Sequence, residues 1–155
     1  MKVYQIQRTT RLPISVDEAW RFFSDPLNLK RITPPYMNFE ILSELPSEAY
    51  EGMIITYKLS PFPLTRVQWI TEITICDKPN FFVDEQRFGP YRFWHHQHVF
   101  KKIDSGIEMQ DIVNYVLPYG VLGRAANFMF VSHQLKKIFD YRAEALKTLI
   151  ASKSL

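Results

Sequence analysis

Residues 89–100 read Gly-Pro-Tyr-Arg-Phe-Trp-His-His-Gln-His-Val-Phe, a turn signal followed by a strand in which aromatic and imidazole side chains recur. Successive side chains of a β-strand point to opposite faces of the sheet. One face of this strand therefore holds Arg92, Trp94, His96, His98 and Phe100. The other face includes Gln97 and ends in Lys101, so we expect the first face to point into the protein.

Two inward histidines need polar partners, because burying an unpaired polar group costs about 1–3 kcal/mol. Along residues 106–117, one face of the next predicted strand holds Ile107, Met109, Asp111, Val113, Tyr115 and Leu117. That face carries one carboxylate, Asp111, and one phenol, Tyr115. We therefore predict that the inward polar groups of the two strands line a pocket.

Length and composition fit one domain over residues 1–155. Hydrophobic residues make up 46% of the chain and aromatic residues 15%, which is enough to fill a core or to wall a cavity. The net charge of +3 comes from basic residues spread along the chain, and we expect no nucleic-acid binding because such binding needs clustered charge.

The single cysteine, Cys76, excludes an internal disulfide and favours a reducing compartment. The first residues lack the apolar core of a signal peptide, and no apolar run approaches the roughly 20 residues of a membrane span. We expect a cytoplasmic protein without stable membrane insertion.

The N-terminal third is predicted to form one strand and two short helices. The strand covers Val3 to Arg11, and Pro13 ends it. Ser15 and Glu18 have the spacing of a capping box, which starts a helix. Asp25-Pro26 starts a second short helix that runs to about Arg31.

Six more strands are expected near residues 37–44, 52–60, 64–76, 80–88, 91–104 and 106–117, and the short turns between them indicate an antiparallel meander. After Gly123 there is no further glycine or proline. Apolar residues recur there at helical spacing, which predicts one helix of roughly 25 residues. Its apolar stripe comprises Phe128, Val131, Leu135, Ile138, Phe139, Leu146 and Leu149.

The simplest packing of this order is an α+β helix-grip fold, in which a curved antiparallel sheet of about seven strands wraps around the long C-terminal helix. Several motifs point the same way: Leu12-Pro13-Ile14-Ser15, Phe82-x-Asp84-x-Gln86, Gly89-Pro90-Tyr91, Trp94-x-His96-x-His98-x-Phe100 and Asp111-x-Val113-x-Tyr115-x-x-Pro118. Over its full length the chain resembles the START/Bet v 1-like (SRPBCC) superfamily, near the polyketide cyclase/dehydrase-related proteins. The motifs are similar to those of a bacterial cell-division-inhibitor-like subgroup.

The resemblance implies a ligand site between sheet and helix, since superfamily relatives bind sterols, lipids, hormones or polyketides and a minority are cyclases or aromatases. Fold alone does not choose between these functions. Three loops that follow alternate strands should surround one mouth of the cavity. Their aromatic residues Phe62, Tyr91 and Tyr119 would form its rim.

Three interpretations of His96 and His98 remain open. In the first, the role is structural, and the imidazoles form hydrogen bonds with Asp84, Asp111, Tyr115 or the backbone. In the second, they contact a ligand. In the third, they bind a metal ion together with a carboxylate. We expect no metal and no cofactor, because the resembled family offers no such site and the histidines lack a common metal-binding spacing.

We expect a protein that binds a small hydrophobic or amphipathic molecule (lipid, polyketide-like or aromatic). The expected contacts are Trp69, Asp84, Trp94, His96, His98, Asp111, Tyr115, Phe128 and Leu135. One alternative is a cyclase or dehydratase that uses His96, His98 and Asp111 as a general-base couple. The other is an interaction module without a ligand, such as a homodimer. The sequence supports a pocket more firmly than a reaction.

Overall fold

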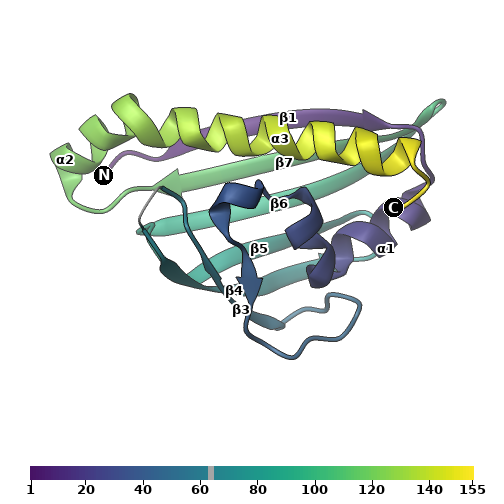
Figure 1. Ribbon diagram of the computed structural model, residues 1–155, viewed down its shortest axis with the longest axis horizontal. Coiled ribbons are helices and arrows are strands. Elements are labelled where there is room, and N and C mark those ends of the chain that lie inside the picture. Colours follow the sequence, from purple (N-terminus) through teal and green to yellow (C-terminus); the bar gives the residue numbers. More distant parts are fainter. Residues whose placement is uncertain (63–64) are drawn as a thin grey trace.

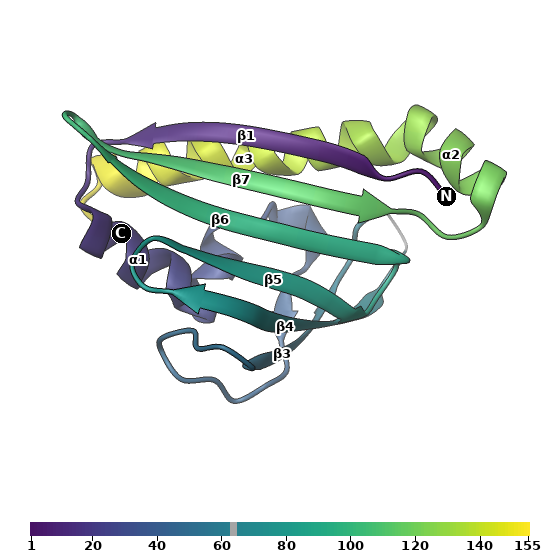
Figure 2. The ribbon, with the colours of Figure 1, turned by 180° about the vertical axis from the view of Figure 1, so that it is seen from behind.

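The computed structural model describes residues 1–62 and 65–155. Seven antiparallel strands form one sheet in the order β1-β7-β6-β5-β4-β3-β2. The strands are β1 (Tyr4–Leu12), β2 (Glu40–Ile41), β3 (Ile54–Leu59), β4 (Val67–Asp77), β5 (Phe81–Phe88), β6 (Phe93–Ile103) and β7 (Gly106–Val116). A long C-terminal helix runs along the sheet (Figure 1). The view from behind places the strands in front of that helix (Figure 2). The predicted α+β helix-grip fold is confirmed.

The capping box predicted at Ser15 is present and starts α1 (Val16–Ser24). The Glu18 amide donates to Ser15 Oγ at 3.2 Å, and the Ser15 amide donates to Glu18 Oε2 at 2.8 Å. These two bonds satisfy amides that have no partner within the helix. The short helix η1 (Pro26–Ile32) follows with Asp25 as its cap, as the Asp25-Pro26 pair predicts.

One predicted strand is largely absent. Residues 37–44 were expected to pair throughout, but only Glu40–Ile41 form β2, and Pro35–Met37 form the short helix η2 instead. Asn38 then adopts a left-handed conformation (φ 46°), which ends that turn and delays the strand. The predicted start of the fourth strand at residue 64 lies outside the described residues.

The C-terminal helix is longer than predicted. It consists of α2 (Gly120–Ala126), a π-helical turn η3 (Asn127–Val131) and α3 (Ser132–Ala151). Gly123, expected to precede the helix, lies inside it. A Cβ atom at this position would stand 2.1 Å from the carbonyl oxygen of Pro118, so only glycine lets α2 approach the end of β7 so closely.

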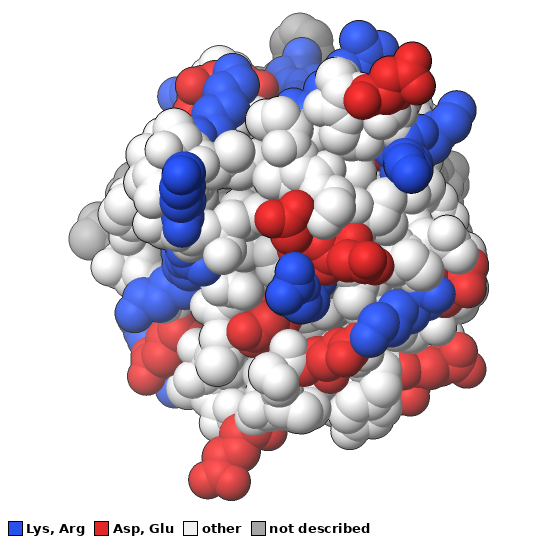
Figure 3. Space-filling model, turned by 90° about the vertical axis from the view of Figure 1, so that its right-hand side faces the viewer, with Lys and Arg blue, Asp and Glu red and all other residues white. Residues whose placement is uncertain are grey.

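Charged residues of both signs are interspersed on the end of the molecule that faces the viewer in Figure 3. No single-sign patch dominates this face. Among the described residues, no helix combines the length and the apolar character that a membrane span requires.

Candidate functional site

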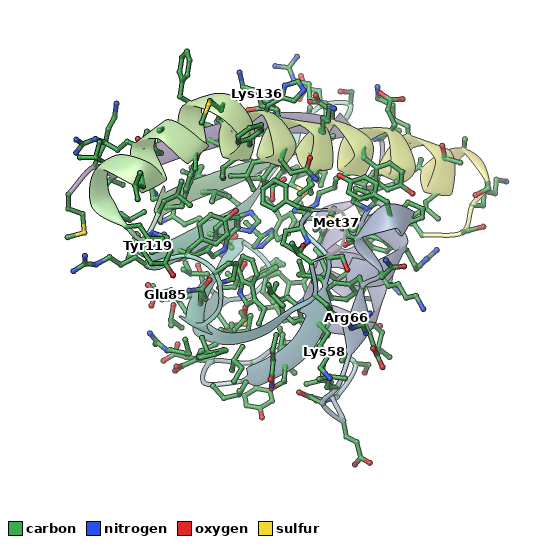
Figure 4. All side chains as sticks on the ribbon, turned by 60° about the vertical axis from the view of Figure 1, so that its left-hand side comes forward. Met37, Lys58, Arg66, Glu85, Tyr119 and Lys136 are labelled. Carbon is green, nitrogen blue, oxygen red and sulfur yellow. The ribbon has the colours of Figure 1, made fainter. Side chains whose placement is uncertain are left out.

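A cavity of about 170 Å³ lies between the sheet and α3. Its walls come from the end of α1, from η1, from the inward faces of β3 to β6 and from α3. The side chains that occupy the space between helix and sheet are visible in Figure 4, where Lys136 points away from the sheet. The curved sheet thus leaves room under the helix that the apolar side chains do not fill completely.

Aromatic side chains form one wall of the cavity. The rings of Trp69 and Trp94 meet edge to face with centroids 5.2 Å apart, and Tyr91 lies 4.8 Å from Trp94. Burial raises the pKa of the Tyr91 phenol, so this hydroxyl stays protonated. This part of the wall is therefore uncharged and mostly apolar.

Beside the aromatic wall, on the same inward face of the sheet, lie charged and polar side chains from three neighbouring strands. In the strand register, His98 lies opposite Asp111 of β7, and His96 lies opposite Asp84 of β5. Because His96 and His98 are two residues apart on β6, both point to the same face of the sheet. Antiparallel pairing thus gathers two carboxylates and two imidazoles on the inward face.

Each imidazole lies between the two carboxylates. His96 Nε2 is 2.9 Å from Asp111 Oδ1, and His96 Nδ1 is 3.3 Å from Asp84 Oδ2. His98 Nε2 is 2.9 Å from Asp84 Oδ2, and His98 Nδ1 is 3.2 Å from Asp111 Oδ1. The two rings are tilted by 39° with their centroids 3.8 Å apart. Both histidines and Asp111 are buried, and Asp84 is nearly so.

The charges in this cluster shift one another's ionisation. Burial opposes ionisation of Asp84, but the positive charge of His96 and hydrogen bonds from both histidines hold the pKa of this carboxyl well below its ordinary value. Burial likewise opposes ionisation of Asp111, and the Arg142 charge and the histidine hydrogen bonds hold its pKa low. Burial would lower the pKa of His96, but the two carboxylates outweigh it and the pKa is raised.

The sequence analysis missed Arg142, which completes the cluster from α3. Its Nη1 atom donates to Asp111 Oδ1 at 3.2 Å, and the residue is 9% exposed. The sequence did contain a signal for this residue, because one cation falls at helical spacing within the apolar stripe. The structure buries this set: Leu135, Phe139, Arg142 and Leu146. A cation on that apolar stripe requires a buried anion on the facing sheet.

The structure places six predicted contact residues in the cavity wall: Trp69, Asp84, Trp94, His96 and His98 from the sheet and Leu135 from α3. Asp111 and Tyr115 are buried beside the cavity without lining it. Asp111 lies behind the histidines, and the Tyr115 hydroxyl donates to Asn127 Oδ1 at 2.8 Å. Both face inward, but neither is a wall residue.

Phe128 is a wrong prediction, since it is 87% exposed. The π-helical turn η3 holds more residues per turn than an α-helix, so the residues before Val131 are rotated around the helix axis. This rotation turns Asn127 inward and Phe128 outward. The prediction from periodicity assumed an unbroken α-helix.

The predicted rim holds only in part. Tyr91 lines the cavity, whereas Phe62 does not, and the neighbouring Pro61 takes its place. Tyr119 is 82% exposed before α2 and is also absent from the wall. Ser24 and the residues of η1, which the sequence analysis left out of the site, line the cavity instead.

The arrangement constrains which chemistry His96 can perform. A raised pKa favours its imidazolium form, which can donate a proton but cannot accept one. That protonation state runs against His96 as the general base of the cyclase hypothesis, which names His96, His98 and Asp111.

Comparison with protein families and with curated proteins finds no match to this sequence. Solved structures do match. The structure of TTHA0849 from Thermus thermophilus has a TM-score of 0.72 at 15% identity, covering 99% of this chain and 100% of that one. The Zhui aromatase/cyclase from Streptomyces sp. R1128 has a TM-score of 0.73 at 14% identity, with 94% and 92% of the two chains covered.

Norcoclaurine synthase from Thalictrum flavum is also similar, with a TM-score of 0.67 at 12% identity and coverage of 97% of this chain and 87% of that one. Likeness at these identities reports architecture, and function has to be argued from the site. Taken with the curved seven-stranded sheet and the helix that lies across it, these structures show that the chain has a helix-grip fold.

Proposed function

We propose that the protein binds one small, mostly apolar molecule that carries a hydrogen-bond-accepting oxygen, in the cavity between the sheet and α3. The observation that carries this proposal is a largely apolar cavity whose wall includes buried hydrogen-bond donors without a partner among the described residues. Ligand pockets characteristically combine an apolar lining with a few polar groups that fix the ligand's orientation.

The volume limits the size of the ligand. A cavity of about 150 Å³ lined by apolar side chains accepts benzene, so the 170 Å³ present here suits one aromatic ring with a short substituent. Pockets for larger, drug-sized ligands measure roughly 300–1,000 Å³. A four-ring sterol is therefore a poor fit unless the walls move.

The unpaired polar atoms indicate the chemistry of the ligand. Trp69 Nε1 and Arg142 Nε are buried and have no hydrogen-bond partner among the described residues, and both residues line the cavity. Each of these atoms can only donate a hydrogen bond. Ser24 Oγ is likewise unpaired in the described part of the wall. Leaving each donor unsatisfied costs about 1–3 kcal/mol, which an oxygen atom of a ligand can recover.

Isothermal titration calorimetry with a size series tests this function. We expect phenol and benzoate to bind with one-to-one stoichiometry, and a four-ring sterol not to bind. Ile138→Trp fills the cavity from α3 and should abolish binding of phenol and benzoate. Lys137→Trp, on the exposed side of the same helix, is the matched control and should bind as the wild type does.

Equal binding by the Ile138→Trp and wild-type proteins would place the compounds outside the cavity and refute the proposal. Failure of every one-ring compound to bind would refute it as well. Native mass spectrometry of the purified protein gives an independent measurement, because a co-purified small molecule should be displaced by excess phenol.

The exposed surface of α2 and η3 favours the interaction module as a second candidate function. Six large apolar side chains between residues 119 and 130 are more than half exposed: Tyr119, Val121, Leu122, Phe128, Met129 and Phe130. Single exposed apolar residues are ordinary, but a contiguous group marks an interaction surface.

Light scattering across a concentration series tests self-association through this surface. We expect Phe128→Lys to abolish any concentration-dependent increase in mass. Tyr50→Lys changes an exposed aromatic residue that is distant in sequence from residues 119–130, and it should leave the increase in mass unchanged. A wild-type protein that stays monomeric throughout would exclude a homodimer.

A further inference from the structure

The two imidazoles between Asp84 and Asp111 raise a question of proton placement. All four nitrogen atoms of His96 and His98 lie 2.9 to 3.3 Å from a carboxylate oxygen. A neutral imidazole has one N–H group and one lone pair. Each neutral ring would therefore hold a lone pair within 2.9 to 3.3 Å of a carboxylate oxygen, which is an unfavourable contact in a buried site.

Protonating both rings does not resolve the conflict. The ring centroids are only 3.8 Å apart, so two imidazolium ions would face each other at close range. Protonating one ring still leaves the other with a lone pair beside a carboxylate. With both carboxyls ionised, the histidines and carboxylates alone thus offer no arrangement in which every contact is attractive.

We propose that Asp84, His96 and His98 bind a divalent first-row transition-metal ion, such as Zn²⁺ or Co²⁺. The ion is held by Asp84 Oδ2, His96 Nδ1 and His98 Nε2, one atom from each residue in a group that lies within 4.8 Å. Both lone pairs then meet a cation. The remaining nitrogens, His96 Nε2 and His98 Nδ1, carry protons, and both of them lie beside Asp111.

The separations between these atoms suit one ion. The Asp84 oxygen is 2.9 Å from His98 Nε2 and 3.3 Å from His96 Nδ1. Ligand atoms about 2.1 Å from a shared ion would subtend angles of roughly 90 to 105° at these separations, within the range of metal sites with two histidines and one carboxylate. Such a set occupies one side of the ion and leaves positions open.

Asp111 and Arg142 support the site from behind. Ligating histidines usually donate their second N–H to a carboxylate, which fixes the ring orientation. Asp111 takes that position for His96 through a hydrogen bond of 2.9 Å, and His98 Nδ1 lies 3.2 Å from the same oxygen without hydrogen-bond geometry. Arg142 Nη1 fixes Asp111 in turn at 3.2 Å. Asp84, His96 and His98 line the cavity while Asp111 does not, so the open metal positions face the cavity.

Spacing along the chain did not favour a metal, because two histidines at i and i+2 match no common motif. The carboxylate comes from the neighbouring strand β5, through the pairing of Asp84 with His96. Only the strand register brings the three ligands together.

Titration of the metal-stripped full-length protein with Co²⁺, followed by visible absorption and by calorimetry, tests the proposal. We expect one ion per chain and a Co²⁺ spectrum with nitrogen and oxygen ligands. Asp84→Asn and His98→Ala should each weaken binding by at least about 100-fold, and Asp111→Asn by about 10- to 100-fold. His95→Ala, on the outward face of the same strand, is the matched control and should bind as the wild type does.

Absence of Co²⁺ binding to the wild-type protein, or equal binding by the Asp84→Asn variant, would overturn the proposal. Circular dichroism shows whether each variant is folded. If His98→Ala does not fold, X-ray absorption of the wild-type complex decides the case by the presence or absence of two imidazole ligands. These measurements use no organic ligand, so their outcome is separate from that of the phenol and benzoate titrations.

Discussion

At the scale of single residues, Asp111 is the group on which the polar wall depends. Its Oδ1 atom lies 2.9 Å from His96 Nε2, 3.2 Å from His98 Nδ1 and 3.2 Å from Arg142 Nη1. Three basic side chains from a strand and a helix thus share one buried oxygen. Removing its charge would leave Arg142 without its carboxylate partner and the two histidines with Asp84 as their one remaining carboxylate in the cluster.

Asp111→Asn should therefore destabilise the protein strongly. Breaking a buried ion pair by removing one partner costs about 3–5 kcal/mol, because the remaining charge stays buried. Urea denaturation of the metal-free protein measures this change. Asp140→Asn serves as the control, since that carboxylate is exposed and lies 3.4 Å from Arg8. A loss as small for Asp111→Asn as for Asp140→Asn would contradict the role assigned to Asp111.

Cys76 provides a pH-dependent prediction away from the site. Burial, together with nearby acidic residues, raises the pKa of its thiol above the ordinary value of 9.0. Only the thiolate reacts with iodoacetamide, so the folded protein should react more slowly at pH 8 than the unfolded chain. The rate should still be rising above pH 9. Because this is the chain's single cysteine, mass spectrometry of the alkylated protein measures the reaction rate of Cys76 directly. Equal rates in the folded and unfolded states would contradict the raised pKa.

At the scale of elements, the contact between β7 and the C-terminal helix determines which side chains at the start of that helix point inward. The π-helical turn Asn127–Val131 directs Asn127 inward, where its Oδ1 accepts a hydrogen bond from the Tyr115 hydroxyl. Both residues are buried. The same turn directs Phe128 to the outer surface. One irregular turn therefore ties the helix to the sheet and sets the phase of the residues before Val131.

Tyr115→Phe should lower stability without changing ligand binding. The substitution leaves Asn127 Oδ1 buried without its donor, which costs about 1–2 kcal/mol. Thermal and urea denaturation measure the loss, and calorimetry with phenol measures binding. Tyr119→Phe is the control because Tyr119 is exposed, and its effect should stay within about 0.5 kcal/mol. Weaker phenol binding by Tyr115→Phe at unchanged stability would place Tyr115 in the wall instead.

At the scale of the whole molecule, the helix-grip architecture leaves a cavity under α3 that crosses four strands of the sheet. Unfilled volume lowers the stability of the folded state, because the side chains around it lose packing contacts. A ligand that occupies the cavity binds only the folded protein, so binding and stability are linked.

A bound one-ring ligand should raise the melting temperature. At a concentration 100 times its dissociation constant, a ligand adds about 2.7 kcal/mol to the free energy of unfolding. For a chain of this length, that corresponds to an increase of roughly 5 to 10 °C. Differential scanning calorimetry with benzoate measures the shift. The Ile138→Trp variant should be insensitive to benzoate, and a shift that persists in it would mean that benzoate stabilises the protein from another site.

Local patterns in the sequence determined the elements and the face that each strand buries. Alternation along residues 93–103 and 106–116 predicted that Trp94, His96, His98 and Asp111 face inward, because strand geometry fixes which side chains share a face. The Ser15 capping box and the Asp25-Pro26 start were equally local, and both were confirmed.

Tertiary structure alone decided which inward residues touch the cavity. Strand register pairs Asp84 with His96. Helix phase brings Arg142 to Asp111 and turns Asn127 inward. A single π-helical turn alters that phase without a periodic signal in the sequence. The sequence by itself established the fold and the inward polar groups, whereas packing of α3 against the curved sheet placed them around a cavity or behind its wall.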